Sequence, residues 1–303
     1  MKTPIRLAAM AVALVMALPV AAVAQDASAP LRPEILLPMA QHGDAWAQLK
    51  LGGLYEHGEG VPKDDTEAAG WYAKAAVQGN REARGLLMLV CAVTEFSSIP
   101  PKVCDQIGPL LQTGAAQGDL ESEDALAKLY ESGMFGLPKD PAQSIAWYQR
   151  AAERGDLLAE SMLASRYEAG IGVPRDDVQA AFWNCKAAEQ GDTPAQIEMA
   201  EAYESGRGVP ADEAQAVAWY LKAAQQNYSD AQRKVGTAYA LGKGVPRDDI
   251  QAYMWLTIAL ASAMRDDENR DADALALKSV GERLKPAELA KAKRMVAAWN
   301  TAH

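Results

Sequence analysis

Tryptophan recurs at a fixed interval along this chain. Trp147, Trp183, Trp219 and Trp255 are each 36 residues apart. Tyrosine keeps the same interval at Tyr167, Tyr203 and Tyr239, with Tyr130 37 residues before the first of them and an earlier pair at Tyr55 and Trp71. A period of this length is typical of stacked repeats, in which each unit buries its apolar face only against its neighbours.

The unit at 191–226 illustrates what is repeated. Its first half is rich in helix-forming residues, and its apolar residues recur at helical spacing: Ala195, Met199, Ala202 and Tyr203. Residues 206–210 end this helix, because glycine accepts positive φ and proline cannot continue a helix. A second helix follows, with an apolar face formed by Trp219, Tyr220, Ala223 and Ala224.

Capping residues stand at matching places in the units. We predict N-caps for the second helices at Asp64, Asp140, Asp176, Asp212 and Asp248. We predict left-handed C-caps at Gly79, Gly118, Gly155, Gly191 and Asn227. Each unit is therefore a helix–turn–helix, and the predicted fold is an all-α solenoid. The helical spacing indicates that the aromatic rows form its core, in preference to a cofactor site.

Two motifs in these units resemble the Sel1-like repeat family, relatives of the tetratricopeptide solenoids. Residues 51–61 (LGGLYEHGEGV) and 71–79 (WYAKAAVQG) carry the resemblance, and related sequences recur at 167–173, 183–191, 191–226 and 227–262. The resemblance covers most of 43–262. It implies a right-handed α-solenoid that acts as an adaptor or scaffold for protein complexes, often at the bacterial envelope. Some exported relatives carry a disulfide in every repeat, a pattern that this chain lacks.

Two stretches depart from the repeat. Residues 80–117 lack the tyrosine and tryptophan, and 96–101 replace the Gly-x-Gly turn, so we interpret them as a degenerate unit whose loop is either a binding feature or drift. The turn at 133–136 has one extra residue. We expect this insertion to expose Met134 and Phe135, which would hint at a contact surface.

The ends of the chain differ from the repeats. Residues 1–24 have a positive start, an apolar run and a small-x-small site at 22–24, which predicts a cleaved signal peptide; the alternative is an uncleaved anchor. The cleavage point has no cysteine, so processing as a lipoprotein is not expected. We expect a flexible tail at 25–32, the solenoid at 33–262, and two C-terminal capping helices within 263–303. The processed protein is expected to be periplasmic or secreted, without a membrane span.

Charge and cysteine content limit the partners and the compartment. The net charge is −10, and removing Lys2 and Arg6 with the first 24 residues leaves −12. This field repels nucleic acid, and no Lys/Arg cluster offsets it. An oxidising compartment permits disulfides. Cys91 and Cys104, 13 residues apart, could pair and leave Cys185 over, or all three could be buried thiols.

The sequence offers little for catalysis. The three histidines, His42, His57 and His303, occur outside HExxH and CxxC settings, so no metal or other cofactor is expected. Nucleophile elbows and Ser-x-x-Lys pairs are missing. Acidic pairs at the helix starts are explained by capping and the helix dipole. We therefore expect a protein that is not an enzyme.

One face of the first helix in each unit varies while the aromatic positions stay constant. Its two positions, two and five residues before the tyrosine, hold Lys50 and Gly53, Ala125 and Lys128, Met162 and Ser165, Glu198 and Glu201, and Lys234 and Thr237. They share a helical face. We hypothesise that this face lines the concave groove and binds a protein partner; the alternative is an ordinary solvated face.

The sequence therefore predicts a non-catalytic protein-interaction scaffold of the cell envelope, with an unidentified protein partner. Two alternatives belong to other classes. One is an envelope hydrolase acting on cell-wall material or β-lactams, as suggested for some Sel1-like relatives. The other is a structural subunit of an export or polysaccharide-secretion assembly. The oligomeric state is left open.

Overall fold

The computed structural model describes residues 32–93, 99–262 and 270–302, which form two compact units, residues 1–104 and 105–303. The signal peptide at 1–24 and most of the expected tail lie outside the described residues. The first unit contains α1 (Pro33–Gln41), α2 (Ala45–His57), α3 (Asp65–Val77), α4 (Arg81–Val93) and α5 (Pro101–Cys104).

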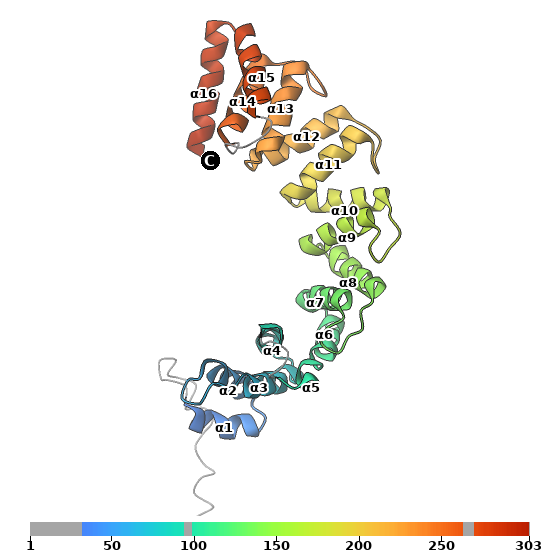
Figure 1. Cartoon of the computed structure of the whole chain (residues 1–303), viewed down its shortest axis with the longest axis vertical. Helices are drawn as coiled ribbons and strands as arrows, with labels where there is room; N and C mark the ends of the chain where they lie inside the picture. Colours follow the sequence, from blue (N-terminus) through green and yellow to red (C-terminus); the bar gives the residue numbers. More distant parts are fainter. Residues whose placement is uncertain (1–31, 94–98, 263–269, 303) are drawn as a thin grey trace, which may run out of the picture. The chain divides into compact units, whose positions relative to one another are not determined.

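The second unit holds the helices from α6 onward. They are α6 (Ile107–Ala116), α7 (Leu120–Ser132), α8 (Pro141–Glu153), α9 (Leu157–Ala169), α10 (Asp177–Glu189), α11 (Thr193–Ser205), α12 (Glu213–Gln225), α13 (Ser229–Leu241), α14 (Asp249–Ser262), α15 (Arg270–Arg283) and α16 (Pro286–Ala302). In both units each helix packs mainly on its neighbours in sequence (Figure 1). The predicted all-α solenoid of helix pairs is confirmed.

The predicted caps form. Asp64, Asp140, Asp176, Asp212 and Asp248 each accept hydrogen bonds from two backbone N–H groups in the first turn of the following helix. At the other helix ends, Gly191 has φ +98° and Asn227 has φ +65°. The latter is tolerated because asparagine adopts left-handed φ more readily than most side chains.

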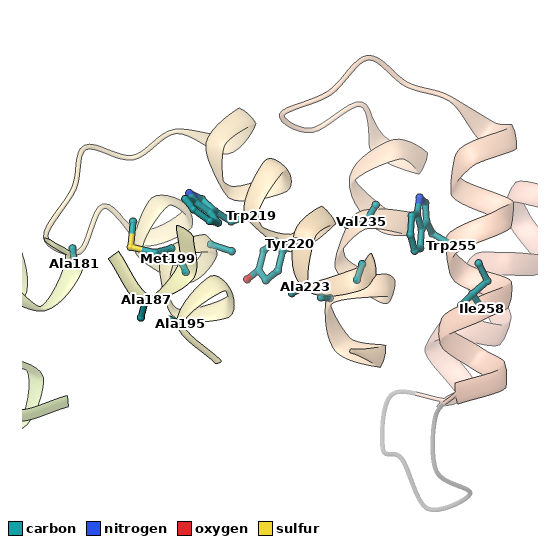
Figure 2. Packing of buried hydrophobic residues seen from close by; sticks show 14 of the residues in the cluster. Ala181, Ala187, Ala195, Met199, Trp219, Tyr220, Ala223, Val235, Trp255 and Ile258 are labelled. Atoms are coloured by element: carbon teal, nitrogen blue, oxygen red, sulfur yellow. The ribbon is translucent and has the colours of Figure 1, made fainter. Parts of the chain in front are cut away.

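The tryptophan row lies in the core, with Trp147 half-buried, whereas the tyrosines of the first helices are half-buried and most of them pack against the core. Figure 2 shows Trp219 and Tyr220 of α12 in one cluster with Met199 of α11 and Val235 of α13. A cation lies over the ring of several tryptophans. Lys74 Nζ is 3.6 Å from the Trp71 ring centroid, and Lys222 Nζ is 3.6 Å from the Trp219 ring centroid. Such contacts contribute about 0.5–1 kcal/mol at exposed sites.

A second row of contacts is polar and joins the two helices of each pair. The residue that caps the end of the second helix reaches back 30 or 31 residues to a buried side chain of the first helix. The pairs are Gln78–Gln48 (2.8 Å), Arg154–Glu123 (3.2 Å), Gln190–Glu160 (2.8 Å) and Gln226–Gln196 (3.0 Å). Three of these capping residues also donate to the glycine carbonyl that ends the preceding pair. This polar ladder therefore ties the two helices of each pair together, and its bonds to the glycine carbonyls link a pair to the one before it.

The expectation that Phe135 is exposed is wrong. Its side chain is 7% exposed, and Met134 is half-buried. The extra residue folds the turn inward over α6: a Cβ on Gly108 would lie 3.0 Å from the Phe135 carbonyl oxygen and 2.9 Å from Leu137 Cγ. Phe135 itself adopts φ +54°. The insertion therefore fills space beside a glycine and adds no contact surface.

The array ends differently from its interior. α15 packs on α14, and Arg283 donates to Asp249 at 2.6 and 3.0 Å, which lowers the pKa of Asp249 to about 2. α16 also packs on α14, where Ile258 replaces the cation found in earlier units. The Trp299 ring lies edge-on to Trp255, with centroids 5.1 Å apart.

The polar ladder supports a prediction at Arg154. Arg154→Ala should lower the free energy of unfolding by about 2 kcal/mol, because it leaves the buried carboxylate of Glu123 with only Arg150, 3.4 Å away. Arg154→Gln should cost much less, because it recreates the Glu–Gln pair of the next unit. Urea unfolding of both variants measures the difference, and equal losses would contradict the role given to the ladder.

Glu160 supports a second prediction. Burial raises the pKa of its carboxyl, so the stability it contributes is complete below the unfolded pKa and is lost as pH rises through the folded value. Glu160→Gln should therefore stabilise the protein near pH 7, by about 1 kcal/mol if the amide bonds the Ala152 carbonyl. Its counterparts Gln48, Gln196 and Gln232 bond the equivalent carbonyls.

The pH dependence of unfolding checks this second prediction. The gain of Glu160→Gln should disappear toward pH 4, where the wild-type carboxyl is protonated. Gln196→Glu is the matched control, because it places a carboxyl at the same position of the next unit and should lose stability as pH rises. A gain that stays constant with pH would contradict burial of the charge as its cause.

Candidate protein-binding site

The eight predicted face residues lie on the first helices of the pairs. Lys50 belongs to α2 of the first unit, and the other seven belong to the second unit: Lys128 on α7, Met162 and Ser165 on α9, Glu198 and Glu201 on α11, and Lys234 and Thr237 on α13. All eight are half-buried or exposed. The five positions three residues before the tyrosines, by contrast, are buried. Variable and constant positions thus lie on different sides of the same helices.

A row of glutamates runs beside this face, one directly after each helix tyrosine from Tyr55 to Tyr203. Glu56 accepts from the Tyr72 hydroxyl at 2.5 Å, and Glu204 accepts from the Tyr220 hydroxyl at 3.0 Å. Glu131 instead forms an ion pair with Arg166 of the next unit at 2.6 Å. Each glutamate is therefore held by a neighbouring helix, which fixes the border of the face.

The acidic part of the face lies on α11. Arg207 Nη2 is 3.0 Å from Glu198 Oε2 and 3.7 Å from Glu168 Oε1, so one cation bridges two carboxylates of successive units. Burial raises the pKa of the Glu201 carboxyl, and the Glu198 carboxylate raises it further. Negative charge exceeds positive charge here, although Lys234 and Arg207 lower the pKa of Glu201 in part.

The basic part lies one unit further, beside a hollow of about 320 Å³ between α12 and α13. Lys234 and Thr237 line this hollow with Glu204, Tyr220 and Leu241. Lys234 Nζ lies 2.9 Å from Glu204 Oε2. Burial raises the pKa of Glu204, but hydrogen bonds from Lys234 and Tyr220 outweigh it and leave this pKa below its ordinary value. A ligand in this hollow would meet a neutralised pair and the exposed Leu241.

A second hollow, of about 430 Å³, lies between α2, α3 and α4 in the first unit. Lys50 and Gly53 line it, and so do Leu86 and Leu89. The two leucines are 36 residues after Lys50 and Gly53, so they occupy the variable face in the degenerate unit. The sequence prediction missed them because it counted from a tyrosine that this unit lacks.

The helix caps could have found these leucines. Asn80 caps α4 by accepting from Ala83 N–H, as Asp44 caps α2 by accepting from Ala47 N–H. The two caps are 36 residues apart, which gives the register without the tyrosine.

The degenerate unit also contains a disulfide between Cys91 of α4 and Cys104 of α5, with Cα atoms 5.9 Å apart, while Cys185 is free.

Chemistry at this face is limited to binding interactions among the residues that the structure describes. Within those residues, no group of three or more His, Cys, Asp or Glu side chains is placed to hold a metal ion. No helix in the described ranges has both the length and the hydrophobicity to cross a bilayer. The face offers ion pairs, amide and hydroxyl groups, and aliphatic side chains, which suit recognition of a polypeptide.

Comparison with known proteins agrees with the helix pairs. The family model described as Sel1 repeat matches residues 47–80, 120–156, 157–192, 193–228 and 229–262, more than half of the chain. The matched residues pass over 81–119, which contain the degenerate unit.

Two solved structures are similar to this chain. One is c5321, a protective antigen of uropathogenic Escherichia coli with an SLR fold (30% identity, TM-score 0.52, covering 88% of this chain and 56% of that one). The other is a Sel1 repeat protein from Oxalobacter formigenes (32% identity, TM-score 0.53, covering 82% of this chain and 69% of that one). This chain thus spans about half of the Escherichia coli protein.

Similarity to curated proteins is confined to a shorter stretch. Chitin synthase regulatory factor 3 of Schizosaccharomyces pombe is 34% identical over 123 residues, which are 40% of this chain and 13% of that protein. Chitin synthase regulator SKT5 of Malassezia restricta is 32% identical over 123 residues, 8% of its length. The matched part is therefore a small fraction of each fungal protein.

The geometry of α11 predicts a titration. In wild type, the Glu201 carboxyl should titrate above the ordinary value for glutamate, because of burial and the neighbouring Glu198 carboxylate. Glu198→Gln should move this pKa downward, since it removes the like charge. Side-chain carboxyl ¹³C NMR as a function of pH measures both values. An unchanged Glu201 pKa in the variant would contradict a charge interaction between the two carboxylates.

Proposed function

Because this chain belongs to the Sel1 repeat family, whose members are generally interaction scaffolds, we propose that it is a non-catalytic adaptor that binds a protein partner along the face formed by its first helices. In the second unit the proposed binding face comprises Lys128, Met162, Ser165, Glu198, Glu201, Lys234 and Thr237. Lys50 occupies the equivalent position on α2 of the first unit. Its partner is a polypeptide segment laid across successive repeats.

One observation carries this proposal: the buried position three residues before each tyrosine stays small, whereas the accessible positions beside it differ in chemistry from unit to unit. The five positions three residues before the tyrosines hold only glycine or alanine, whereas the face holds bases, acids, a thioether and hydroxyls. Core positions are restricted by packing. An accessible face that differs from unit to unit can encode a partner's sequence, which is how repeat scaffolds obtain specificity.

The order of side chains along the face indicates the chemistry of the partner. The segment would pass an aliphatic surface at Met162 on α9, then the acidic pair Glu198 and Glu201 on α11, then the hollow beside Lys234 on α13. Charge complementarity therefore favours a partner with a basic residue next to an apolar one. The pKa of Glu201 is raised, so this carboxyl ionises only as pH rises. Binding of a basic partner should therefore strengthen as pH rises.

We also propose that the protein works in the periplasm or outside the cell. The disulfide between Cys91 and Cys104 supports an oxidising compartment, because cytosolic thiols are kept reduced. The apolar run and small-residue site in residues 1–24 support export through a signal peptide. A partner would then be another exported or envelope protein.

Charge reversal at α11 tests the proposal. In pull-downs from envelope extract, Glu198→Lys with Glu201→Lys should reduce recovery of the partner by about tenfold or more, equivalent to about 1.4 kcal/mol. Quantitative mass spectrometry of the captured proteins gives the measurement.

The control variant carries Glu153→Lys and Glu189→Lys. It changes net charge equally at exposed positions in the last turns of α8 and α10, away from the proposed face. Recovery with this control should match wild type. Equal recovery with both variants would sink the assignment of the binding face, and hydrolysis of a wall fragment by the purified protein would overturn the non-catalytic role.

A further inference from the structure

Helix α4 carries an apolar stripe that no other described helix covers. Leu89 is 53% exposed, Val93 is 72% exposed, and Leu86 is half-buried. The three are spaced i, i+3 and i+7, so they form one line along the helix. Exposed aliphatic residues in a continuous line, in contrast to isolated ones, mark an interaction surface.

The opposite side of α4 is apolar as well. Ala83, Leu87, Val90 and Cys91 are buried in the first unit, and the disulfide from Cys91 to Cys104 holds this side down. From Leu86 to Val93 the helix is apolar on every side, and such a segment is normally buried all round. Since the disulfide and the core already fix one side of α4, it cannot turn to hide Leu86, Leu89 and Val93 within the first unit, and the described helices of that unit leave the stripe open.

The stripe forms one wall of the hollow of about 430 Å³ in the first unit. The floor is open because Gly53 has no side chain, and only the Tyr72 hydroxyl comes near a Cβ placed there, at 3.7 Å. Three glutamates also line the hollow against the single cation of Lys50: Glu59 and Glu82 are exposed and form an acidic rim, and Glu56 is half-buried and accepts from the Tyr72 hydroxyl. The hollow is thus apolar within and acidic at its edge.

We propose that this hollow binds an amphipathic helix of a partner protein, with aliphatic side chains three or four residues apart inserted against Leu86 and Leu89, and with lysine or arginine residues flanking them. The proposal rests on the proposed function, since it specifies what the first unit recognises. It adds a recognition site in the degenerate unit, where the repeat has lost its tyrosine and tryptophan. Apolar contacts of this kind supply affinity, and the acidic rim selects basic flanks.

Charge argues against the two other ways of covering the stripe. A second copy related by a two-fold axis would bring Glu56, Glu59 and Glu82 close to their own counterparts, and like charges facing each other oppose association. A membrane surface rich in anionic lipid would be repelled by the same rim. A separate basic polypeptide is the occupant that satisfies both the apolar wall and the acidic edge.

A peptide selection tests this inference. The processed protein, purified from the periplasm of an expression host, is used to select from a phage-displayed library of random peptides long enough to form several helical turns. Enriched peptides should share aliphatic residues three or four apart and flanking lysine or arginine. Fluorescence anisotropy of synthetic copies should show at least tenfold weaker binding to Leu89→Lys, and weaker binding to Leu89→Ala as well.

Leu275→Lys is the matched control, because Leu275 is 68% exposed on α15, outside the hollow. It should bind the peptides as wild type does, and circular dichroism should show that every variant retains its helices. Peptides that bind Leu89→Lys as tightly as wild type, or that carry acidic flanks, would overturn the inference. So would a wild-type dimer, or binding to anionic vesicles, that Leu89→Lys abolishes.

The variant with Glu198→Lys and Glu201→Lys separates this inference from the proposed function. Peptides that lose affinity for that variant and keep it for Leu89→Lys would leave the proposed function standing and remove the site on α4. A selection that enriches no peptide would count against both.

Discussion

The close approach of the two helices in each pair depends on one small residue. It lies three positions before the helix tyrosine, and its occupants are Gly52, Ala127, Ala164, Ala200 and Gly236. A Cβ on Gly52 would lie 2.6 Å from the Tyr72 ring, so nothing larger than glycine fits there. The aromatic core and the polar ladder both require this spacing between helices, and a larger side chain would push the two helices of the pair apart.

Uniform spacing has a consequence for the proposed binding face. Because the polar ladder and the aromatic rows hold each pair in the same way, side chains at equivalent positions occupy equivalent places within their units. A change of chemistry from Ser165 to Glu201 to Thr237, which are all exposed, is then a change of surface only, with little effect on packing. The cations Arg166, Arg207 and Lys234, which pair with glutamates of the preceding unit, also serve the stack, so they are less free to vary.

The fold could be predicted from the sequence because its determinants are local and repeated. Trp183 and Trp219 mark the period, Asp176 and Asp212 begin helices, and each signal is confirmed several times within one chain. Phe135 could not be placed this way, because its burial depends on the space beside Gly108, which is distant in sequence. Leu86 and Leu89 were missed for a different reason: the register was counted from aromatic residues, and the degenerate unit retains only its cap.

The disulfide shows a similar limit. Its two cysteines could be suggested as a pair from their separation, but the sequence could not distinguish a bond from two buried thiols. The bond became evident only once α4 and α5 were placed, because pairing requires Cα atoms about 4.4–6.8 Å apart. Its value to the degenerate unit is also clear from the fold: α4 has lost the tyrosine that anchors other first helices, and Cys91 stands in that place, 36 residues after Tyr55.

The contact between Trp255 and Trp299 determines how such a protein can lengthen during evolution. At Trp71, Trp147 and Trp219 a lysine or arginine of the same helix covers the tryptophan, so a duplicated unit of this kind brings its own cover. After α14 the cover comes from α16, and a unit added at that point would separate the two rings and leave both in water. Gain and loss of repeats is therefore expected in the interior, with the last three helices inherited as one block.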